Sequence, residues 1–441
     1  MNYWRRNGEW DMRSKMNTTA EEKQARPALV PKLRFPEFRD AEGWTLEAGD
    51  SLFNQINDRN PEPGLNVLAI TQEYGAIPRH MIDYHVSVTE KSIESYKVVR
   101  IGDFIISLRS FQGGIEYSRY HGICSPAYVI LRRRGKGSDE YFRHYLKTDR
   151  FIRILTKNLE GLRDGKMISY SQFAELQLPI PTPAEQQKIA ECLSSVDDLI
   201  AAQARKVDAL KTHKKGLMQQ LFPREGESQP RLRFPEFQNA GEWEKKRVDE
   251  RGNVLAGKAL AVNAPGPLRP YLRTKNVLDG TIDLSDVLTM PMTDAEFSRF
   301  EVLDGDILLN EGQSLGLVGR ASIYRGEFDQ RCAMQNALLR FRAFPSTCPE
   351  FAAQAFQQCQ KDGTFASIAT QTTSVAHLGS SRFSALELTW PPTFAEQQRI
   401  ATCLSSLDAL IIAETQKHEA LKTHKKGLMQ QLFPSLDEVV P

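Results

Sequence analysis

The chain has 441 residues, of which 41% are hydrophobic and 25% are charged, and its formal net charge is +2. This composition is that of an ordinary soluble globular protein with room for two or three domains. No apolar run approaches the roughly 18–20 residues that cross a bilayer, the N-terminus lacks a signal-peptide core, and the low net charge leaves any nucleic-acid binding to a local basic face.

The N-terminal segment 1–30 is polar and charged, and nothing later in the chain resembles it. We expect it to be a poorly ordered extension. Met12 and Met16 are alternative starts to Met1, and the run MNTTAEEK after residue 15 would make a natural beginning. We therefore expect translation to begin at Met16.

The first half opens with PKLRFPEF at 31–38, and Trp44 follows. The body that continues to residue 182 is typical of a mixed α/β domain, because short β-type runs (LNVLAIT, DFIISL, AYVILR) alternate with turn residues. A helix is expected around Asp139–Leu155. We predict a first domain over 31–182.

Residues 183–223 predict one long helix. Apolar residues recur in steps of four and three, interrupted only at Gln203 and Lys214, which is the 3.5-residue period of a coiled-coil seam. Prolines 183 and 223 suit its start and its end. A polar linker, 224–229, completes the segment 183–229. The predicted seam residues of this helix are Ile189, Leu193, Val196, Ile200, Leu210, Leu217 and Leu221.

The second half repeats the ends of the first. PRLRFPEF at 230–237 matches the opening segment at an offset of 199, and 30 of the 40 residues in Ala184–Pro223 recur in Ala395–Pro434 at an offset of 211. The second body, 230–393, again mixes β-type runs (DILLN, ALLRF, LELTW) with a helix expected around Glu350–Lys361. The segment 394–441 holds the second long helix, with the seam residues Ile400, Leu404, Leu407, Ile411, Leu421, Leu428 and Leu432.

The bodies diverge while the ends match, so the repeat predicts two copies of one α/β fold with altered surfaces. VRIGDFIISL at 99–108 resembles VLDGDILLN at 302–310. Polar residues in both seams would fix the register of a helix pair at some cost in stability. The alternative is two separate amphipathic helices, each packed on its own domain.

We find no catalytic or metal-binding pattern. The six cysteines form no CxxC pair, which indicates a reduced, cytoplasmic protein without a disulfide framework or zinc site. Phosphate-loop, zinc-protease and dinucleotide-binding motifs are missing. Gly312–Gly316 fits GxSxG around Ser314, but a nucleophile elbow needs a helix directly after it, and LVGRASIY does not predict one. A hydrolase is therefore a remote alternative.

Loops in both bodies mix planar hydrogen-bonding side chains with cations and aromatic residues, as in RSFQGGIEYSRYH (109–121) and NEGQSLGLVGR (310–320). Arg and Lys suit guanine edges and phosphates, and Gln and Asn suit adenine edges. For any single residue an ordinary polar loop is the alternative, but similar loops in two related bodies favour a recognition surface. The candidate DNA contacts are Gln72, Arg79, Arg109, Gln112, Arg119, Arg163, Lys166, Arg273, Lys275, Asn276, Gln313, Arg320 and Arg382.

The order of these motifs resembles the specificity subunit of type I restriction–modification systems over about residues 31–434. The resemblance rests on LRFPEF followed by Trp, the Gly-Asp strand at 102–103 and 305–306, the PTxAEQQxI helix start, and the duplicated LKTHKKGLMQQLFP tail. YLRTKNVLDGTIDL in the second half also resembles the start of a target-recognition domain.

The resemblance implies two target-recognition domains that each read one half of a split, asymmetric DNA sequence. It implies that the long helices pair antiparallel as a spacer and dock two methyltransferase subunits, with motor-nuclease subunits completing the complex. The subunit itself would be non-catalytic and bind no cofactor, while S-adenosylmethionine, ATP and Mg would bind to its partners. A non-catalytic helical adaptor that tethers protein partners is the alternative.

Overall fold

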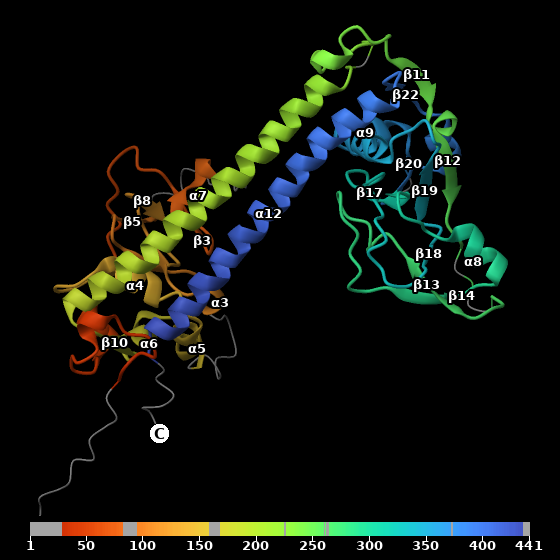
Figure 1. Cartoon of the computed structure of the whole chain (residues 1–441). Coiled ribbons are helices and arrows are strands. Elements are labelled where there is room, and N and C mark those ends of the chain that lie inside the picture. The colour runs from red at the N-terminus through yellow and green to blue at the C-terminus, as the bar shows by residue number, and fades with distance from the viewer. Residues whose placement is uncertain are drawn as a thin grey trace, which may run out of the picture. The chain divides into compact units, whose positions relative to one another are not determined.

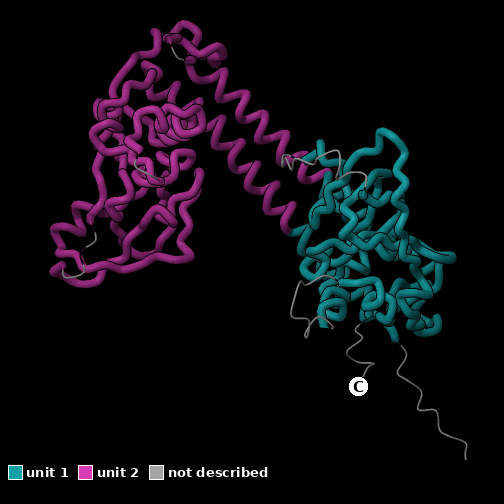
Figure 2. Tube along the Cα trace, turned by 180° about the vertical axis from the view of Figure 1, so that it is seen from behind, with its two compact units in different colours: residues 1–201, 420–441 teal, residues 202–419 magenta. Residues whose placement is uncertain are grey.

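A computed structural model describes residues 29–82, 95–157, 168–224, 226–259, 261, 264–371 and 374–434. The expected disordered extension therefore lies outside the described residues, except for its last two. The chain divides into two compact units (Figure 2): unit 1 contains residues 1–201 and 420–441, and unit 2 contains residues 202–419. Each unit thus combines one body with parts of both long helices.

The body of unit 1 is built on a four-stranded antiparallel sheet of order β2-β9-β6-β7, with β1-β10, β3-β4 and β5-β8 as separate antiparallel pairs. The strands are β1 (Thr45–Ala48), β2 (Phe53–Ile56), β3 (Leu68–Thr71), β4 (Gly75–Pro78), β5 (Lys97–Val99), β6 (Phe104–Ile106), β7 (Glu116–Tyr117), β8 (Gly122–Cys124), β9 (Val129–Arg133) and β10 (Gln177–Ile180). The helices are η1 (Pro36–Phe38), α1 (Gly49–Leu52), η2 (Arg79–Met81), α3 (Ser110–Gly113), α4 (Asp139–Tyr145), α5 (Asp149–Lys157) and α6 (Tyr170–Ala174).

The helix expected around Asp139–Leu155 is two helices, α4 and α5. The chain breaks at Thr148, whose hydroxyl donates to the Tyr145 carbonyl and accepts from the Phe151 amide. A threonine that bonds its own neighbouring backbone ends one helix and caps the next. The expectation of one continuous helix was therefore wrong at this point.

The body of unit 2 has a matching four-stranded sheet of order β12-β19-β15-β17, with additional three-stranded sheets β14-β13-β18 and β16-β21-β20 and the pair β11-β22. The strands are β11 (Glu244–Arg247), β12 (Gly252–Ala256), β13 (Leu268–Leu272), β14 (Leu288–Pro291), β15 (Ile307–Asn310), β16 (Gly312–Gln313), β17 (Ala321–Ile323), β18 (Ala333–Met334), β19 (Leu338–Ala343), β20 (Thr370–Gln371), β21 (Ala376–His377) and β22 (Glu387–Trp390). The helices are η3 (Pro235–Phe237), η4 (Val248–Glu250), α8 (Asp294–Phe300), α9 (Pro349–Lys361), α10 (Thr364–Ile368) and α11 (Ser380–Ala385). The expected β-type runs and the helix around Glu350–Lys361 are confirmed.

The repeated Gly-Asp strand start has the same physical basis in both bodies. Gly102 and Gly305 adopt φ angles of 93° and 86°, which an L side chain rarely adopts. The following aspartates are 0% and 1% exposed. Each carboxylate is held by a two-pronged arginine contact, Asp103 by Arg132 at 2.7 and 2.8 Å and Asp306 by Arg342 at 2.7 and 2.6 Å. The motif is therefore a structural part of the fold.

Two helices of 39 residues each, α7 (Pro183–Leu221) and α12 (Phe394–Leu432), lie side by side (Figure 1). Within unit 2 the Gln203 amide donates to the Glu414 carboxylate at 2.6 Å, and the Lys214 ammonium lies 2.6 Å from Asp408. As the residue number rises along α7 from Gln203 to Lys214, the residue contacted on α12 falls from Glu414 to Asp408. The two helices are therefore antiparallel. Direct pairing also overturns the alternative of two separate helices.

The predicted seam faces inward. All fourteen apolar seam residues named above are buried or half-buried. The polar interruptions lie in the same seam, where Gln203 and Lys214 are both 7% exposed. Unit 1 has its own contact of this kind, between Asp197 and Lys425 at 2.5 Å. At an offset of 211, Asp197 corresponds to Asp408 and Lys214 corresponds to Lys425. The same ion pair of the repeat therefore forms once in each unit.

Each body's core is completed by the helix end that belongs to the other half of the sequence. In unit 1, Leu432 and Phe433 are each 1% exposed and belong to the core around β6 and α4. In unit 2, Met218 and Leu221 belong to the core around β15 and α9 in the same way. The identical LMQQLFP tails therefore have identical uses.

The opening segment and the helix start are joined by another repeated ion pair. Arg34 donates to both carboxylate oxygens of Glu185 at 2.8 Å, and Arg233 donates to those of Glu396 at 2.7 and 2.8 Å. Both glutamates are almost fully buried. The repeated LRFPEF and AEQQ motifs are thus the two sides of one buried contact.

Candidate nucleic-acid interface

Three candidate residues of unit 1 come together on two neighbouring loops. The Gln72 side chain, in the turn between β3 and β4, donates to the Arg109 carbonyl at 3.3 Å. Gly113, in α3, leaves space for it, since an added Cβ would lie 2.6 Å from the Gln72 amide carbon. Gln72, Arg109 and Gln112 are all exposed, so two amides and one guanidinium can meet an external ligand.

The Arg109 loop is held rigidly. The Ser107 amide donates to the Ser110 hydroxyl at 2.8 Å, and the Arg109 amide donates to the Ser107 hydroxyl at 3.2 Å. Ser110 is 1% exposed. Because these bonds fix the backbone before any ligand binds, Leu108 and Arg109 are presented with little ordering cost.

The other candidates of unit 1 are placed differently. Arg119 is exposed but lies 3.2 Å from Glu140, and Arg325 with Glu350 repeats this ion pair in unit 2 at 2.7 Å. That recurrence favours a structural role. Arg79 is half-buried in η2. The two further candidates, Arg163 and Lys166, lie outside the described residues.

In unit 2 the small sheet β16-β21-β20 joins two of the predicted loops. Gln313 pairs with Ala376, and the Leu378 amide donates to the Glu311 carbonyl at 2.9 Å. The exposed Arg382 guanidinium donates to the His377 carbonyl at 2.8 Å. The sheet thereby brings Gln313 and Arg382 to one edge of the body.

The remaining candidates of unit 2 are less exposed or already engaged. Arg273 and Lys275 both contact Asp286, the lysine at 2.7 Å. Asn276 is 1% exposed, and its amide donates to the Asp283 carbonyl at 2.7 Å, which favours a role in the turn. Arg320 is half-buried at the end of the β16 loop.

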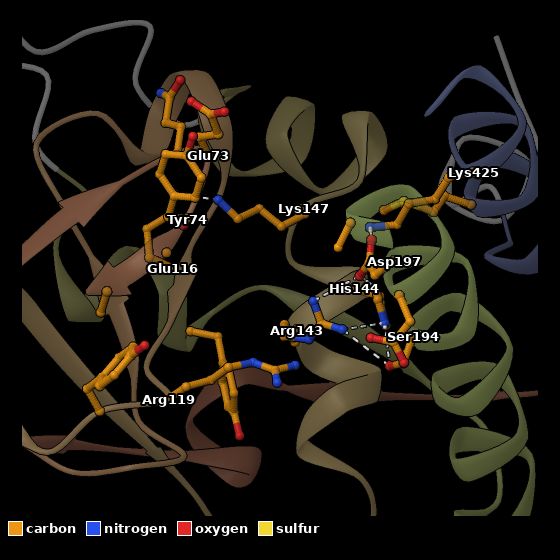
Figure 3. Close-up of a pocket in the computed structure, with 18 residues that line it drawn as sticks. Glu73, Tyr74, Glu116, Arg119, Arg143, His144, Lys147, Ser194, Asp197 and Lys425 are labelled. Carbon is orange, nitrogen blue, oxygen red and sulfur yellow. Dashed lines mark hydrogen bonds and ion pairs between the residues drawn. The ribbon is translucent and has the colours of Figure 1, made fainter. Parts of the chain in front are cut away.

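A groove of about 520 Å³ in unit 1 lies between the β3–β4 turn and the helix pair (Figure 3). Glu73 and Tyr74 line one side, and Ser194, Asp197 and Lys425 line the other. The floor comes from the end of α4, where Arg143 contacts Glu140 and lies 3.1 Å from Asp197. The groove contains tyrosine and arginine, which are enriched in interfaces, together with acidic side chains, which are depleted there.

Burial shapes the titration of the groove floor. Burial raises the pKa of Glu116 and lowers the pKa of Lys147, and the ion pair between them opposes both shifts. Burial, assisted by the charge of Arg143, lowers the pKa of His144 to about 2. His144 is therefore neutral at physiological pH, and its Nε2 atom shares a hydrogen bond of 3.2 Å with the Ser194 hydroxyl.

Sequence reasoning missed three residues beside the candidate contacts. Tyr74 is 61% and Leu108 is 50% exposed, whereas Glu116 is 2% exposed with one carboxylate oxygen unpartnered among the described residues. Tyr74 and Leu108 could have been noticed as apolar neighbours of Gln72 and Arg109. Nothing in the sequence places Glu116 against Lys147, because the partner is 31 residues away.

The GxSxG sequence around Ser314 does not have the structure of a nucleophile elbow. Ser314 is exposed, and the chain after it continues through a turn into β17, not into a helix. Among the described residues no group of three or more histidine, cysteine, aspartate or glutamate side chains could hold a metal ion. No helix within the described ranges is long and apolar enough to span a membrane.

Two related domains that present different loops on one shared, internally repeated helix pair define a class of protein. The family model described as the type I restriction modification DNA specificity domain matches residues 53–212 and 241–423. These ranges are most of the chain. The chain belongs to this family.

Individual relatives agree with the family. The type I restriction enzyme MjaVIII specificity subunit of Methanocaldococcus jannaschii is 27% identical over 176 residues, which are 39% of this chain and 40% of the relative. The putative MjaX specificity subunit of the same organism is 24% identical over 54% of this chain and 58% of the relative. The alignments thus span about half the length of these curated relatives.

Solved structures share the fold. The S subunit of a type I restriction–modification system from M. genitalium superposes with a TM-score of 0.53 at 14% identity, covering 92% of this chain and 99% of that one. A chain from a study of type I system assembly and conformational transition also gives 0.53, at 16% identity, covering 89% and 98%. The mixed α/β domains and antiparallel helix pair are therefore the fold of such subunits.

Proposed function

We propose that this chain is the specificity subunit of a type I restriction–modification complex, in which each body reads one half of a split, asymmetric DNA target. The observation that carries the proposal is the contrast between a duplicated frame and divergent loops. The Arg–Glu, Asp–Arg and Asp–Lys pairs form once in each unit. The exposed residues of the loops differ, as two different half-sites require.

We also propose that the helices dock two copies of one methyltransferase subunit. Away from the seam, Ser195 and Leu199 on α7 recur as Ser406 and Leu410 on α12. All four are exposed, the two leucines to 57% and 40%. Exposed apolar positions that are identical at an offset of 211, on helices that differ at neighbouring positions, suit a partner that binds twice.

In this proposal the subunit supplies recognition and the partners supply chemistry. S-adenosylmethionine would bind to the methyltransferase subunits, and ATP and Mg to the motor-nuclease subunits. Gln72, Arg109 and Gln112 of unit 1 would contact the bases of one half-site, and Gln313 and Arg382 of unit 2 would contact those of the other. Nearby cations would contact the phosphates. The complex would act in the cytoplasm.

Methylation mapping tests the proposal. The chain would be co-expressed with its neighbouring methyltransferase gene in a methylation-free host, and modified adenines would be located by single-molecule sequencing. We expect one split motif with a methyladenine in each half. A soluble complex that leaves no methylation and shows no salt-dependent binding to duplex DNA would instead support a protein-tethering adaptor.

A further inference from the structure

Leu108 lies beside the expected base contacts of unit 1, and half of its side chain is exposed. A single exposed leucine needs no explanation by itself. Leu108, however, directly precedes Arg109, whose carbonyl accepts hydrogen bonds from the Gln72 side chain and from the Gln112 backbone at 2.9 Å. An apolar side chain is thus displayed among amide and guanidinium groups.

The position of Leu108 is fixed by its neighbours. The Ser107 amide donates to the Ser110 hydroxyl at 2.8 Å, and the Arg109 amide donates to the Ser107 hydroxyl at 3.2 Å. Both serines are buried. A leucine that only covered the domain surface would not need a rigid, outward turn, whereas a side chain that must meet one atom group of a ligand does.

Unit 2 repeats the combination with a different sequence. The loop after β15 carries Gln313 with Leu315 and Leu317, which are 42% and 38% exposed. Its turn is closed by the Leu317 amide, which donates to the Ser314 carbonyl at 2.9 Å, and anchored by Gln360, which donates to the Gly316 carbonyl at 2.7 Å. Two divergent loops on equivalent strands therefore both pair an amide with exposed leucine.

This combination matches the major-groove edge of an A·T pair. Adenine offers N6 and N7 to a glutamine amide, and thymine offers its C5-methyl group to an apolar side chain. We propose that Leu108 contacts the methyl group of a thymine in the half-site read by unit 1, with the Gln112 amide on the adenine edge. The proposal rests on the proposed function and names one base feature that unit 1 reads.

Deoxyuridine, which lacks only the thymine methyl group, tests the contact. The complex with methyltransferase subunits would be titrated with duplexes of the mapped target in which each thymine of the first half-site is replaced singly. We expect one replacement to weaken binding about fourfold, as for the loss of one buried methylene-sized group. The L108A complex should bind thymine DNA more weakly and show no further loss with deoxyuridine at that position.

Ile101 provides the matched control. It is 68% exposed and precedes β6, whereas Leu108 follows the same strand, so the I101A complex should keep the fourfold loss. Recognition of the second half-site by L108A reports that the variant is folded. The contact is overturned if every deoxyuridine duplex binds wild type normally, if L108A keeps the loss, or if the first half-site contains no A·T pair. A complex without any sequence preference would instead remove the proposed function.

Discussion

Arg109 carries the exposed guanidinium of the proposed recognition surface in unit 1, and it forms no ion pair within the described residues. We expect R109A to weaken specific DNA binding by about 1–3 kcal/mol and to relax one position of the first half-site, because a bidentate base contact is lost. Methylation mapping of the variant measures the relaxed position. R382A is the control from unit 2, and should change the second half-site alone. An unchanged motif for R109A would contradict the assignment.

Glu185 carries a buried charge with a structural role, in contrast to the exposed charge of Arg109. Its carboxylate is 1% exposed and receives both prongs of Arg34. Removing one member of a buried ion pair leaves the other unpaired, so E185Q should destabilise unit 1 by about 3–5 kcal/mol. Regional hydrogen exchange checks this, since protection should fall in unit 1 while E396Q lowers it in unit 2. Equal loss in both units would show that the pair does not act locally.

The sequence only partly distinguishes an arginine exposed for binding, such as Arg109, from one buried in a structural ion pair, such as Arg34. Loop composition singles out Gln72, Arg109 and Gln112, and the fold brings these three residues together. Composition cannot show that Arg34 is bound to a carboxylate 151 residues away, or that Asn276 is turned inward. Such contacts depend on which segments the fold brings together, and that information is not local.

At the scale of elements, the long helices were the most predictable part of the fold. Their period of 3.5 residues continues for many turns, and prolines mark the ends. The break between α4 and α5 was not predictable, because one threonine hydroxyl decides it against an apolar pattern that continues. The small sheet β16-β21-β20 also escaped prediction, since strands of two residues carry too little periodicity.

The seam contact of Glu414 predicts a pH effect. Hydrogen bonds from Lys206 and then Gln203 lower the pKa of Glu414 below its ordinary 4.5. A carboxyl whose folded-state pKa is lowered stabilises the fold above its ordinary pKa and loses that contribution as the pH falls through the lowered value. E414Q should therefore melt below wild type at pH 7, and the difference should shrink in acid below about pH 4.5. Thermal unfolding across this range measures it.

Glu419, on the same helix but 61% exposed at its side chain, is the control for that experiment. E419Q should differ little from wild type at pH 7, since exposed ion pairs contribute weakly. If E414Q and E419Q showed the same small effect at every pH, the seam contact would not be stabilising.

The length of the helix pair also has a testable consequence. Inserting four residues at Gln203 and four at Glu414 keeps the two helices matched and lengthens each by about 6 Å. If the helices space the half-sites as proposed, the gap in the methylated motif should grow by about two base pairs at 3.4 Å each. Methylation mapping gives the gap directly. A motif with its original gap would remove the spacer role.

In each unit the core of the body is completed by the end of the long helix that comes from the other half of the sequence. Phe433 lies against Tyr141 and Tyr145, with ring centroids 5.6 and 5.5 Å apart. Truncating the buried pair Leu432 and Phe433 to alanine should cost several kcal/mol, at about 2–5 for each large side chain. Hydrogen exchange should show the loss in unit 1, at the far end of the sequence from most of that unit.

The repeat supplies the matched variant for this prediction. L221A with F222A removes the equivalent pair from unit 2, where Leu221 is 1% exposed and the Phe222 ring lies 5.3 Å from that of Phe351. The two double variants should lower protection in opposite units. A loss confined to the mutated helix end itself, with both cores protected, would show that the tails are not part of the cores.

Because each helix end packs in the core of the other half's body, the order of synthesis decides when each core is complete. At about 5–20 residues per second, a ribosome needs roughly 15–60 s to pass from Tyr145 to Leu432. During that interval Tyr141 and Tyr145 of α4 lack Phe433, which packs against them in the finished fold, whereas the end of α7 that completes the second core is synthesised before the second body. The half that is made first is therefore completed last, once the final turn of α12 has been synthesised.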